Sequence, residues 1–224
     1  MTKQSFALEG QDRVALSLLR EVQLGTYLDI GCAHPVDISN TYLFYTLGWR
    51  GVCIDGRESL RSIWSEIRPE DKFIGALCGQ HFEKRKYFCF PEESLNTCDP
   101  QTAARYIKRY EASEVYSEER EVYTANSIWT KEMGIGSCPN LVSIDVEGFE
   151  IPIIRGLISE SFKPDVLIIE TKLFNFNKPH ESSIIKEMKA LGYAVIAKTP
   201  LDCFFINSES KYLSWIPEDM TKAL

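Results

Sequence analysis

The stretch from residue 27 to residue 56 constrains the fold of this chain more than any other part of the sequence. It contains two short apolar runs, at 27–30 and 51–55, separated by a segment that has capping residues for a helix. Asp29 and Asp55 stand near the carboxyl ends of these runs, and Gly31 follows the first. The pattern predicts a strand, a tight turn, a helix and a second strand, which together form half of a nucleotide-binding α/β sheet.

The residues of the first turn favour a ligand without a diphosphate. A dinucleotide needs several closely spaced glycines at this turn, but Gly31 is followed by Cys32, Ala33 and His34. Asp29 places a carboxylate before the turn, where it would repel a diphosphate and attract an ammonium group. We therefore expect a ligand that has a ribose at one end and an amino acid at the other, such as S-adenosylmethionine.

The rest of the chain continues the alternation of strands and helices. This alternation predicts an α/β fold of the Rossmann-like type, with a doubly wound, mostly parallel seven-stranded sheet and a closing antiparallel pair. We expect one domain over residues 1–224, with an amino-terminal helix at about 11–24 and a polar insertion at about 91–124 that covers the substrate site. The seven strands are predicted at 27–30, 51–55, 72–78, 140–146, 166–170, 193–197 and 203–206.

Composition and charge narrow the possible partners. The formal net charge of -7 argues against a nucleic-acid partner. The seven cysteines contain no Cys-x-x-Cys pair, so we expect buried free thiols. No run approaches the ~18 apolar residues that a membrane span requires. These features predict a cytoplasmic protein that acts on a small molecule or glycan, and they leave its oligomeric state open.

Several motifs together resemble the FkbM-type methyltransferases. They are Tyr-Leu-Asp-Ile-Gly-Cys-Ala-His-Pro at 27–35, Ser-Asn-Thr-Tyr at 39–42, Gly-Trp-Arg-Gly at 48–51, Leu-Asn-Thr at 95–97 and Ser-Ile-Asp-Val-Glu-Gly-Phe-Glu at 143–150. The resemblance extends from Gly10 to about Glu170. It implies the class I methyltransferase fold and O-methylation of hydroxyl groups on polyketides or on the sugars of glycans.

The turn and the strand ends supply the candidate cofactor residues. We expect Asp29 to face the amino-acid part of the cofactor and Asp55 to accept both ribose hydroxyls. Cys78, at the end of the third strand, is the candidate for the adenine end by topology. The full set of predicted cofactor-binding residues is Asp29, Gly31, Cys32, Ala33, Asn40, Thr41, Asp55, Gly56 and Cys78.

The candidate catalytic residues gather at the end of the fourth strand. A hydroxyl nucleophile needs either a general base or a metal ion that acidifies it. Asp145, Glu147 and His34 are the candidate bases. Alternatively, Asp145 and Glu170, at the ends of adjacent strands, could bind Mg²⁺ or another hard divalent cation.

Two other functions remain compatible with these residues. One is an oxidoreductase of the NAD type, which the missing glycines disfavour. The other is a non-catalytic scaffold subunit that keeps the cofactor cleft. The leading prediction is an S-adenosylmethionine-dependent O-methyltransferase that acts on a hydroxyl of a sugar, a glycan or a secondary metabolite.

Overall fold

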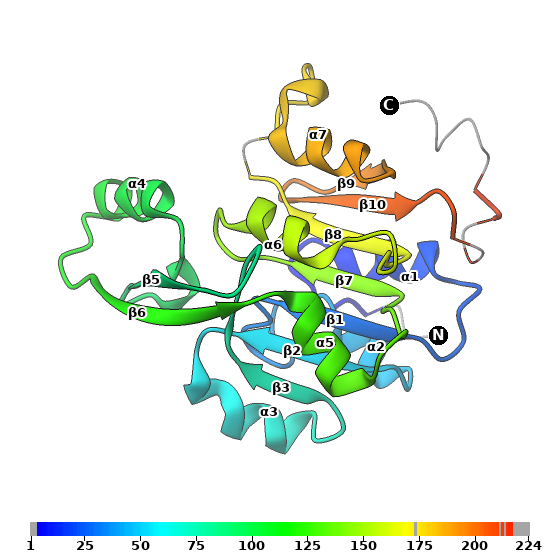
Figure 1. Ribbon diagram of the computed structural model, residues 1–224, viewed down its shortest axis with the longest axis horizontal. Helices are drawn as coiled ribbons and strands as arrows, with labels where there is room; N and C mark the ends of the chain where they lie inside the picture. The colour runs from blue at the N-terminus through cyan, green and yellow to red at the C-terminus, as the bar shows by residue number, and fades with distance from the viewer. Residues whose placement is uncertain (1–3, 173, 211, 213, 217–224) are drawn as a thin grey trace.

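The computed structural model describes residues 4–172, 174–210, 212 and 214–216. Residues 217–224, which close the predicted domain, lie outside this range. Figure 1 shows a central sheet with an arm that projects beyond the ends of its strands. Among the described residues no helix is long and apolar enough to cross a membrane.

The central sheet has seven strands in the order β3-β2-β1-β7-β8-β10-β9. β10 is antiparallel to both of its neighbours, and the other pairs are parallel. The predicted doubly wound sheet with its closing antiparallel pair is therefore confirmed. The strands are β1 (Thr26–Ile30), β2 (Arg50–Asp55), β3 (Lys72–Gly75), β7 (Leu141–Ile144), β8 (Val166–Glu170), β9 (Tyr193–Lys198) and β10 (Asp202–Asn207).

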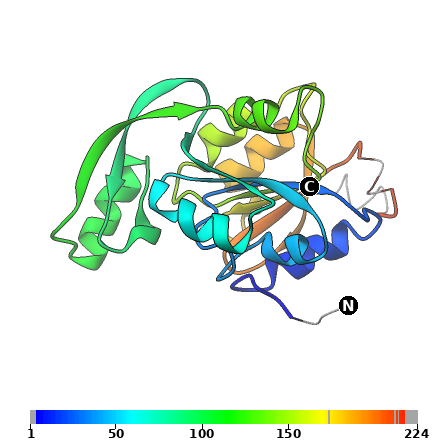
Figure 2. The ribbon, with the colours of Figure 1, turned by 90° about the horizontal axis from the view of Figure 1, so that it is seen from below.

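Helices cover both faces of this sheet, as Figure 2 shows. Side chains alternate between the faces of a strand, so Leu28 and Ile30 of β1 join one core cluster and Tyr27 joins the other. One face carries α1 (Gln11–Leu18), α2 (Tyr42–Thr46) and α3 (Arg61–Ile67), which follows the short 3-10 helix η1 (Glu58–Leu60). The other carries α5 (Ala125–Met133), α6 (Glu150–Leu157) and α7 (Ser183–Ala190), which follows η3 (Pro179–Glu181).

The arm consists of residues 83–123 and lies beside the carboxyl ends of β1, β2 and β7 (Figure 1). Its elements are β5 (Glu83–Cys89), η2 (Glu93–Leu95), α4 (Pro100–Tyr110) and β6 (Tyr116–Tyr123). β5 and β6 form a second sheet together with the two-residue strand β4 (Leu77–Cys78), in the order β4-β6-β5. The predicted insertion at 91–124 thus contains η2, α4 and β6 but omits β5, the first strand of the arm.

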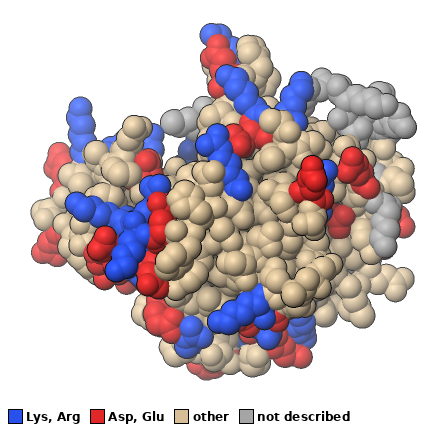
Figure 3. Space-filling model, viewed as in Figure 1, with Lys and Arg blue, Asp and Glu red and all other residues tan. Residues whose placement is uncertain are grey.

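The charged run Glu-Glu-Arg-Glu at residues 118–121 lies in strand β6 of the arm. The sequence analysis did not predict this strand. In the antiparallel register of β5 and β6, Lys84 lies opposite Glu121 and Lys86 lies opposite Glu119. Opposite charges on facing residues stabilise such a pair, although β6 alone is too charged to predict as a strand. Figure 3 shows acidic and basic side chains interspersed over the arm.

Three predicted elements have different bounds in the structure. The predicted helix at 11–24 ends at Leu18, because the chain turns back to enter β1 and Gly25 packs against Trp49. The helix predicted between the first two strands begins only at Tyr42, after Ile38 with a φ of 59°. The predicted strand at 72–78 divides, because residues 77–78 pair with β6 in the second sheet.

Candidate functional site

Strand register brings the predicted acids to one edge of the sheet. Four isoleucines align across neighbouring strands: Ile30, Ile54, Ile144 and Ile169. The residues that follow them therefore share the carboxyl edge, and they are Gly31, Asp55, Asp145 and Glu170. This edge is where open α/β sheets bind their ligands.

Gly31 allows the first turn to lie against the end of β7. Its φ is 82°, and a Cβ atom there would lie 1.7 Å from the carbonyl oxygen of Asp145. Its N–H donates to the carbonyl of Ile54 at 2.8 Å, and the Asp145 N–H donates to the carbonyl of Ile30 at 2.9 Å. No residue with a side chain fits this position, both for its conformation and for its close approach.

A cavity of about 370 Å³ opens at this edge. That volume is within the usual range for small-molecule and cofactor sites. Most of the predicted site residues line it, namely Asp29, Gly31, Cys32, Ala33, His34, Asn40, Asp55, Gly56, Cys78, Asp145 and Glu147. Thr41 and Glu170 do not: Thr41 is buried behind Asp29, and Glu170 faces a second cavity.

At one end of the cavity, Asp29 is held in place by a buried hydrogen-bond network. Its Oδ2 accepts a 2.6 Å bond from the Thr41 hydroxyl, which in turn accepts bonds from Arg68. Arg68 is 1% exposed and forms a 2.7 Å ion pair with Asp71. Burial raises the pKa of Asp29 to about 6. Thr41 therefore contacts Asp29 and does not line the cavity.

Asp55 does not present the free carboxylate that the sequence analysis expected. Its Oδ1 accepts bonds from the backbone N–H of Arg57 at 2.9 Å and from Nε of Arg57 at 2.8 Å. Its Oδ2 accepts bonds from the Ala33 N–H and from Nη2 of Arg57, both at 2.9 Å. Arg57 thus occupies the oxygens that were predicted to bind the ribose.

Apolar side chains line the cavity around Cys78. This cysteine belongs to β4 rather than to the third strand, and Leu77, Tyr87 and Phe149 lie in the same wall. Burial raises the pKa of the Cys78 thiol to about 12, so the thiol is neutral at pH 7. A flat, uncharged group such as adenine suits this wall.

His34 lies half-buried at the cavity with one ring nitrogen already engaged. Its Nδ1 accepts backbone N–H bonds from Val36 at 3.2 Å and from Asp37 at 3.0 Å. Only Nε2 then remains to exchange a proton with a ligand.

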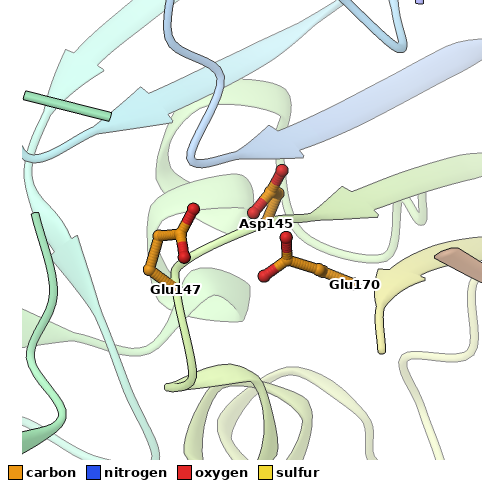
Figure 4. A group of neighbouring side chains, drawn as sticks. All are labelled: Asp145, Glu147 and Glu170. Carbon is orange, nitrogen blue, oxygen red and sulfur yellow. The ribbon is translucent and has the colours of Figure 1, made fainter. Parts of the chain in front are cut away.

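The carboxylates of Asp145, Glu147 and Glu170 converge beyond the end of β7. Each offers an oxygen within 4.8 Å of the others, and Figure 4 shows the three groups turned toward one another. Lys172 donates to Glu147 at 2.6 Å and lies 2.7 Å from Glu170. The hydroxyl of Tyr106, in α4, also donates to Glu147. We call these three carboxylates and the Lys172 ammonium the acid cluster.

Crowding changes the protonation of the acid cluster. The side chain of Asp145 is exposed to the first cavity, and desolvation by the surrounding protein together with Glu170 and Glu147 raises its pKa well above the usual range. Desolvation and the neighbouring Glu147 raise the pKa of Glu170 to about 7, against the opposing effect of Lys172. The cluster can therefore hold and exchange protons near neutral pH.

The acid cluster also fits a hard cation by its donor type. Three carboxylates are the oxygen ligands that Mg²⁺ prefers. Lys172, however, already neutralises Glu147 and Glu170, so a divalent cation would compete with an ammonium group for the same oxygens.

The family model described as the methyltransferase FkbM domain matches residues 29–195. This match spans most of the chain. The chain belongs to the FkbM methyltransferase family. Its class of activity is therefore S-adenosylmethionine-dependent methyl transfer, which replaces the NAD-type alternative. No curated protein matches the chain.

Solved methyltransferase structures resemble this FkbM-family chain distantly. A precorrin-6Y C5,15-methyltransferase from Geobacter metallireducens GS-15 is 12% identical, with 92% of each chain covered and a TM-score of 0.45. A TehB-like SAM-dependent methyltransferase from Corynebacterium glutamicum ATCC 13032 Kitasato is 10% identical, with 89% of this chain and 88% of that chain covered and a TM-score of 0.42.

A third solved structure is the 1,6-didemethyltoxoflavin-N1-methyltransferase of Burkholderia thailandensis with bound 1,6-didemethyltoxoflavin and S-adenosylhomocysteine. It is 10% identical, with 89% of this chain and 77% of that chain covered and a TM-score of 0.43. Because all three TM-scores lie below 0.5, the assignment to the FkbM family rests on the family model.

Four residues of the FkbM-family site were not predicted: Arg57, Arg68, Tyr106 and Lys172. Lys172 follows the strand-end Glu170 by two positions, and Arg57 follows Asp55 by two, so a cation two residues after a strand-end acid was a usable signal. Nothing in the sequence could place Tyr106 or Arg68, because both reach the site through tertiary packing.

A second cavity, of about 330 Å³, lies on the other side of the acid cluster. Asp145 and Glu147 line the first cavity, whereas Glu170 and Lys172 line the second, so the cluster separates the two. The walls of the second cavity come from α4, the residues around the start of α6, the end of β8 and the start of α7. They include Arg105, Tyr106, Phe174, Ser182 and Ser183.

Proposed function

We propose that this FkbM-family protein transfers the methyl group of S-adenosylmethionine to a hydroxyl of a sugar, a glycan or a secondary metabolite. One observation carries this proposal: the acid cluster lies between two cavities and contains carboxyls whose pKa values are raised. A site of this kind can hold a cofactor on one side and an acceptor on the other, and it can take up the hydroxyl proton between them.

The first cavity offers complementary groups along its length for the cofactor. Asp29 would attract the ammonium group, and the turn of Gly31, Cys32 and Ala33 would follow the methionine part. Gly56 and Asp55 would lie by the ribose, and the apolar wall at Cys78 by the adenine. The Asn40 side chain, which donates to Ser143 at 3.0 Å, would border the amino-acid end. When bound, S-adenosylmethionine supplies the methyl group.

Asp145 is the first candidate for the base. Its carboxylate faces the open cavity, and its raised pKa makes it a stronger base than an ordinary aspartate. Glu147 is less suited, because Lys172 and Tyr106 both donate to its carboxylate. His34 would have to act through Nε2. The chain would thus orient the acceptor and take the proton on a carboxylate oxygen of Asp145.

The second cavity is the proposed acceptor site, and the arm provides one of its walls. Tyr106 joins the arm to the acid cluster, and the neighbouring Arg105 lines the cavity. Phe174 presents an aromatic side chain from the segment after β8, and the start of α7 contributes serine hydroxyls. This mixture of aromatic and polar groups suits a polyhydroxylated acceptor. The arm would then carry the acceptor specificity.

A divalent cation bound by Asp145 and Glu170 is the second candidate for proton handling. The donor set fits Mg²⁺, and the Lys172 ammonium competes with it. Exhaustive chelation separates the two possibilities. If Lys172 alone neutralises the cluster, transfer continues at an unchanged rate in EDTA; an enzyme that stops in EDTA and recovers with Mg²⁺ requires the metal.

The decisive experiment is methyl transfer from radiolabelled S-adenosylmethionine to a library of hydroxyl compounds. We expect label in at least one hydroxyl acceptor, and Asp145→Asn should reduce turnover by about 10²-fold or more while the affinity for S-adenosylhomocysteine stays within about twofold. Glu187→Gln, a half-buried acid that is paired with Arg155 and lines neither cavity, is the matched control and should leave both values unchanged.

Two outcomes would contradict the proposal. Binding of S-adenosylhomocysteine without transfer to any hydroxyl would favour the scaffold alternative. Equal losses of turnover and cofactor affinity in Asp145→Asn would assign Asp145 a structural role.

A further inference from the structure

All acceptor positions of Asp55 are occupied. Each of its two oxygens accepts two hydrogen bonds, three of them from Arg57 and the fourth from the backbone of Ala33. A carboxylate has about four lone-pair sites, so none is left for the two hydroxyls of a ribose. A ribose can bind Asp55 only if the Arg57 side chain moves away.

Arg57 has a second carboxylate within reach. Its Nη1 lies 3.8 Å from Oε2 of Glu93, and both residues line the first cavity. The side chain of Asp55 is 7% exposed, whereas that of Glu93 is 59% exposed. The pair with Asp55 is therefore the stronger of the two, and the pair with Glu93 is an alternative that solvent weakens.

We propose that Arg57 exchanges between these two carboxylates, holding Asp55 in the free protein and pairing with Glu93 when a nucleoside ribose occupies Asp55. This inference rests on the proposed placement of S-adenosylmethionine in the first cavity. It makes Arg57 a positioning residue that keeps Asp55 ordered and competes with the ribose for its oxygens.

The exchange also couples the cofactor to the arm. Glu93 belongs to η2, which lies in the arm between β5 and α4. When the Arg57 guanidinium leaves Asp55 at the end of β2 and pairs with Glu93, it ties the arm to the carboxyl edge of the central sheet. The wall of the second cavity is then fixed after the cofactor has bound.

The test is a double-mutant cycle on the affinity for S-adenosylhomocysteine, measured by calorimetry. Arg57→Met keeps the apolar stem and removes the guanidinium donors, leaving only the backbone N–H, so the ribose no longer competes with the side chain and we expect affinity to rise by about three- to tenfold. Glu93→Gln should lower affinity by about two- to fivefold in the presence of Arg57 and should have no effect in the Arg57→Met background. 5′-Methylthioadenosine, which retains the ribose and adenine, should respond in the same way.

Arg61→Met is the matched control, because Arg61 pairs with the exposed Glu58 and touches neither Asp55 nor Glu93. It should leave the affinity unchanged. Weaker binding in Arg57→Met would overturn the inference, as would an equal effect of Glu93→Gln in both backgrounds. If Arg57→Met folds poorly, the exposed Glu93→Gln variant still tests the inference, because an unchanged affinity in that variant alone would overturn it. Failure of the wild-type protein to bind S-adenosylhomocysteine would instead contradict the proposed function.

Discussion

Gly31 combines two constraints that can be separated by experiment. It shares a φ of 82° with Gly10, but a Cβ atom would meet the Asp145 carbonyl only at Gly31, since nothing lies within 4 Å at Gly10. We expect Gly10→Ala to lower the free energy of unfolding by about 1 kcal/mol, from the backbone conformation alone. Gly31→Ala should lower it by about 3 kcal/mol or more and abolish binding of S-adenosylhomocysteine.

Urea unfolding and calorimetry measure these two effects. Equal destabilisation by the two variants would mean that a Cβ atom at position 31 does not clash with the Asp145 carbonyl. That result would contradict the geometry of the turn.

Glu150 should make stability depend on pH. Burial raises its pKa to about 7, although its Oε1 accepts the Gly148 N–H at 2.9 Å. The folded protein therefore holds a proton on Glu150 that the unfolded chain releases above about pH 4.3. Stability from this group is fully present below that pH and is lost as the pH rises to about 7.

Glu150→Gln should remove this dependence. Between pH 5 and pH 8, the free energy of unfolding of the wild type should fall relative to the variant by up to about 3 kcal/mol. Urea denaturation at both pH values measures the difference, with the exposed Glu160→Gln as a control that keeps the wild-type profile. A wild-type profile for Glu150→Gln would show that another group controls the pH dependence.

At the scale of elements, α4 begins at a side-chain cap whose contribution can be tested. Asp99 accepts the Thr102 N–H at 2.8 Å and caps the start of the helix, whose Ala103 and Tyr106 form a small core cluster with Phe90. Asp99→Ala should cost about 1 kcal/mol, and we expect the loss to remain local to the arm. Amide hydrogen exchange in α4 should then be about fivefold faster, with β1 and β7 unchanged.

Thr124→Ala is the control for this prediction, because Thr124 caps α5 in the same manner through a 3.1 Å bond from the Ser127 N–H. Its effect should appear in α5 and leave α4 protected. Faster exchange across the whole molecule in Asp99→Ala would show that the arm does not open independently.

At the scale of the whole molecule, the first cavity joins the central sheet to the arm. Its walls include strand ends of the central sheet, Cys78 and Tyr87 of the second sheet, and Thr97. A ligand that binds this cavity stabilises both parts, and at one hundred times its dissociation constant it contributes about 2.7 kcal/mol. For a chain of this size we expect S-adenosylhomocysteine to raise the melting temperature by about 5–10 °C.

Differential scanning calorimetry checks this shift. NADH at the same concentration should produce none, because the turn lacks the glycines that a diphosphate requires. A shift with NADH and none with S-adenosylhomocysteine would contradict the cofactor assignment.

The sequence by itself determined the central sheet, Gly31 and the acids at the strand ends. Buried parallel strands are short apolar runs, and the residue after each run lies at the carboxyl edge whatever the rest of the fold does. These signals are local, so periodicity and a single glycine were enough to find them. The same reasoning could not fix the ends of the first two helices, which depend on contacts with Trp49 and with the loop before Tyr42.

Only the tertiary structure decided how the charges of the site are neutralised. Lys172 reaches Glu147, Tyr106 reaches the same carboxylate from the arm, and Arg57 covers Asp55. The charged strand β6 likewise exists because β5 lies opposite with complementary side chains. Except for the contact between Arg57 and Asp55, these contacts join residues that are far apart in the sequence and are brought together only by the fold. For them, a local sequence pattern cannot identify the residue that neutralises a buried charge.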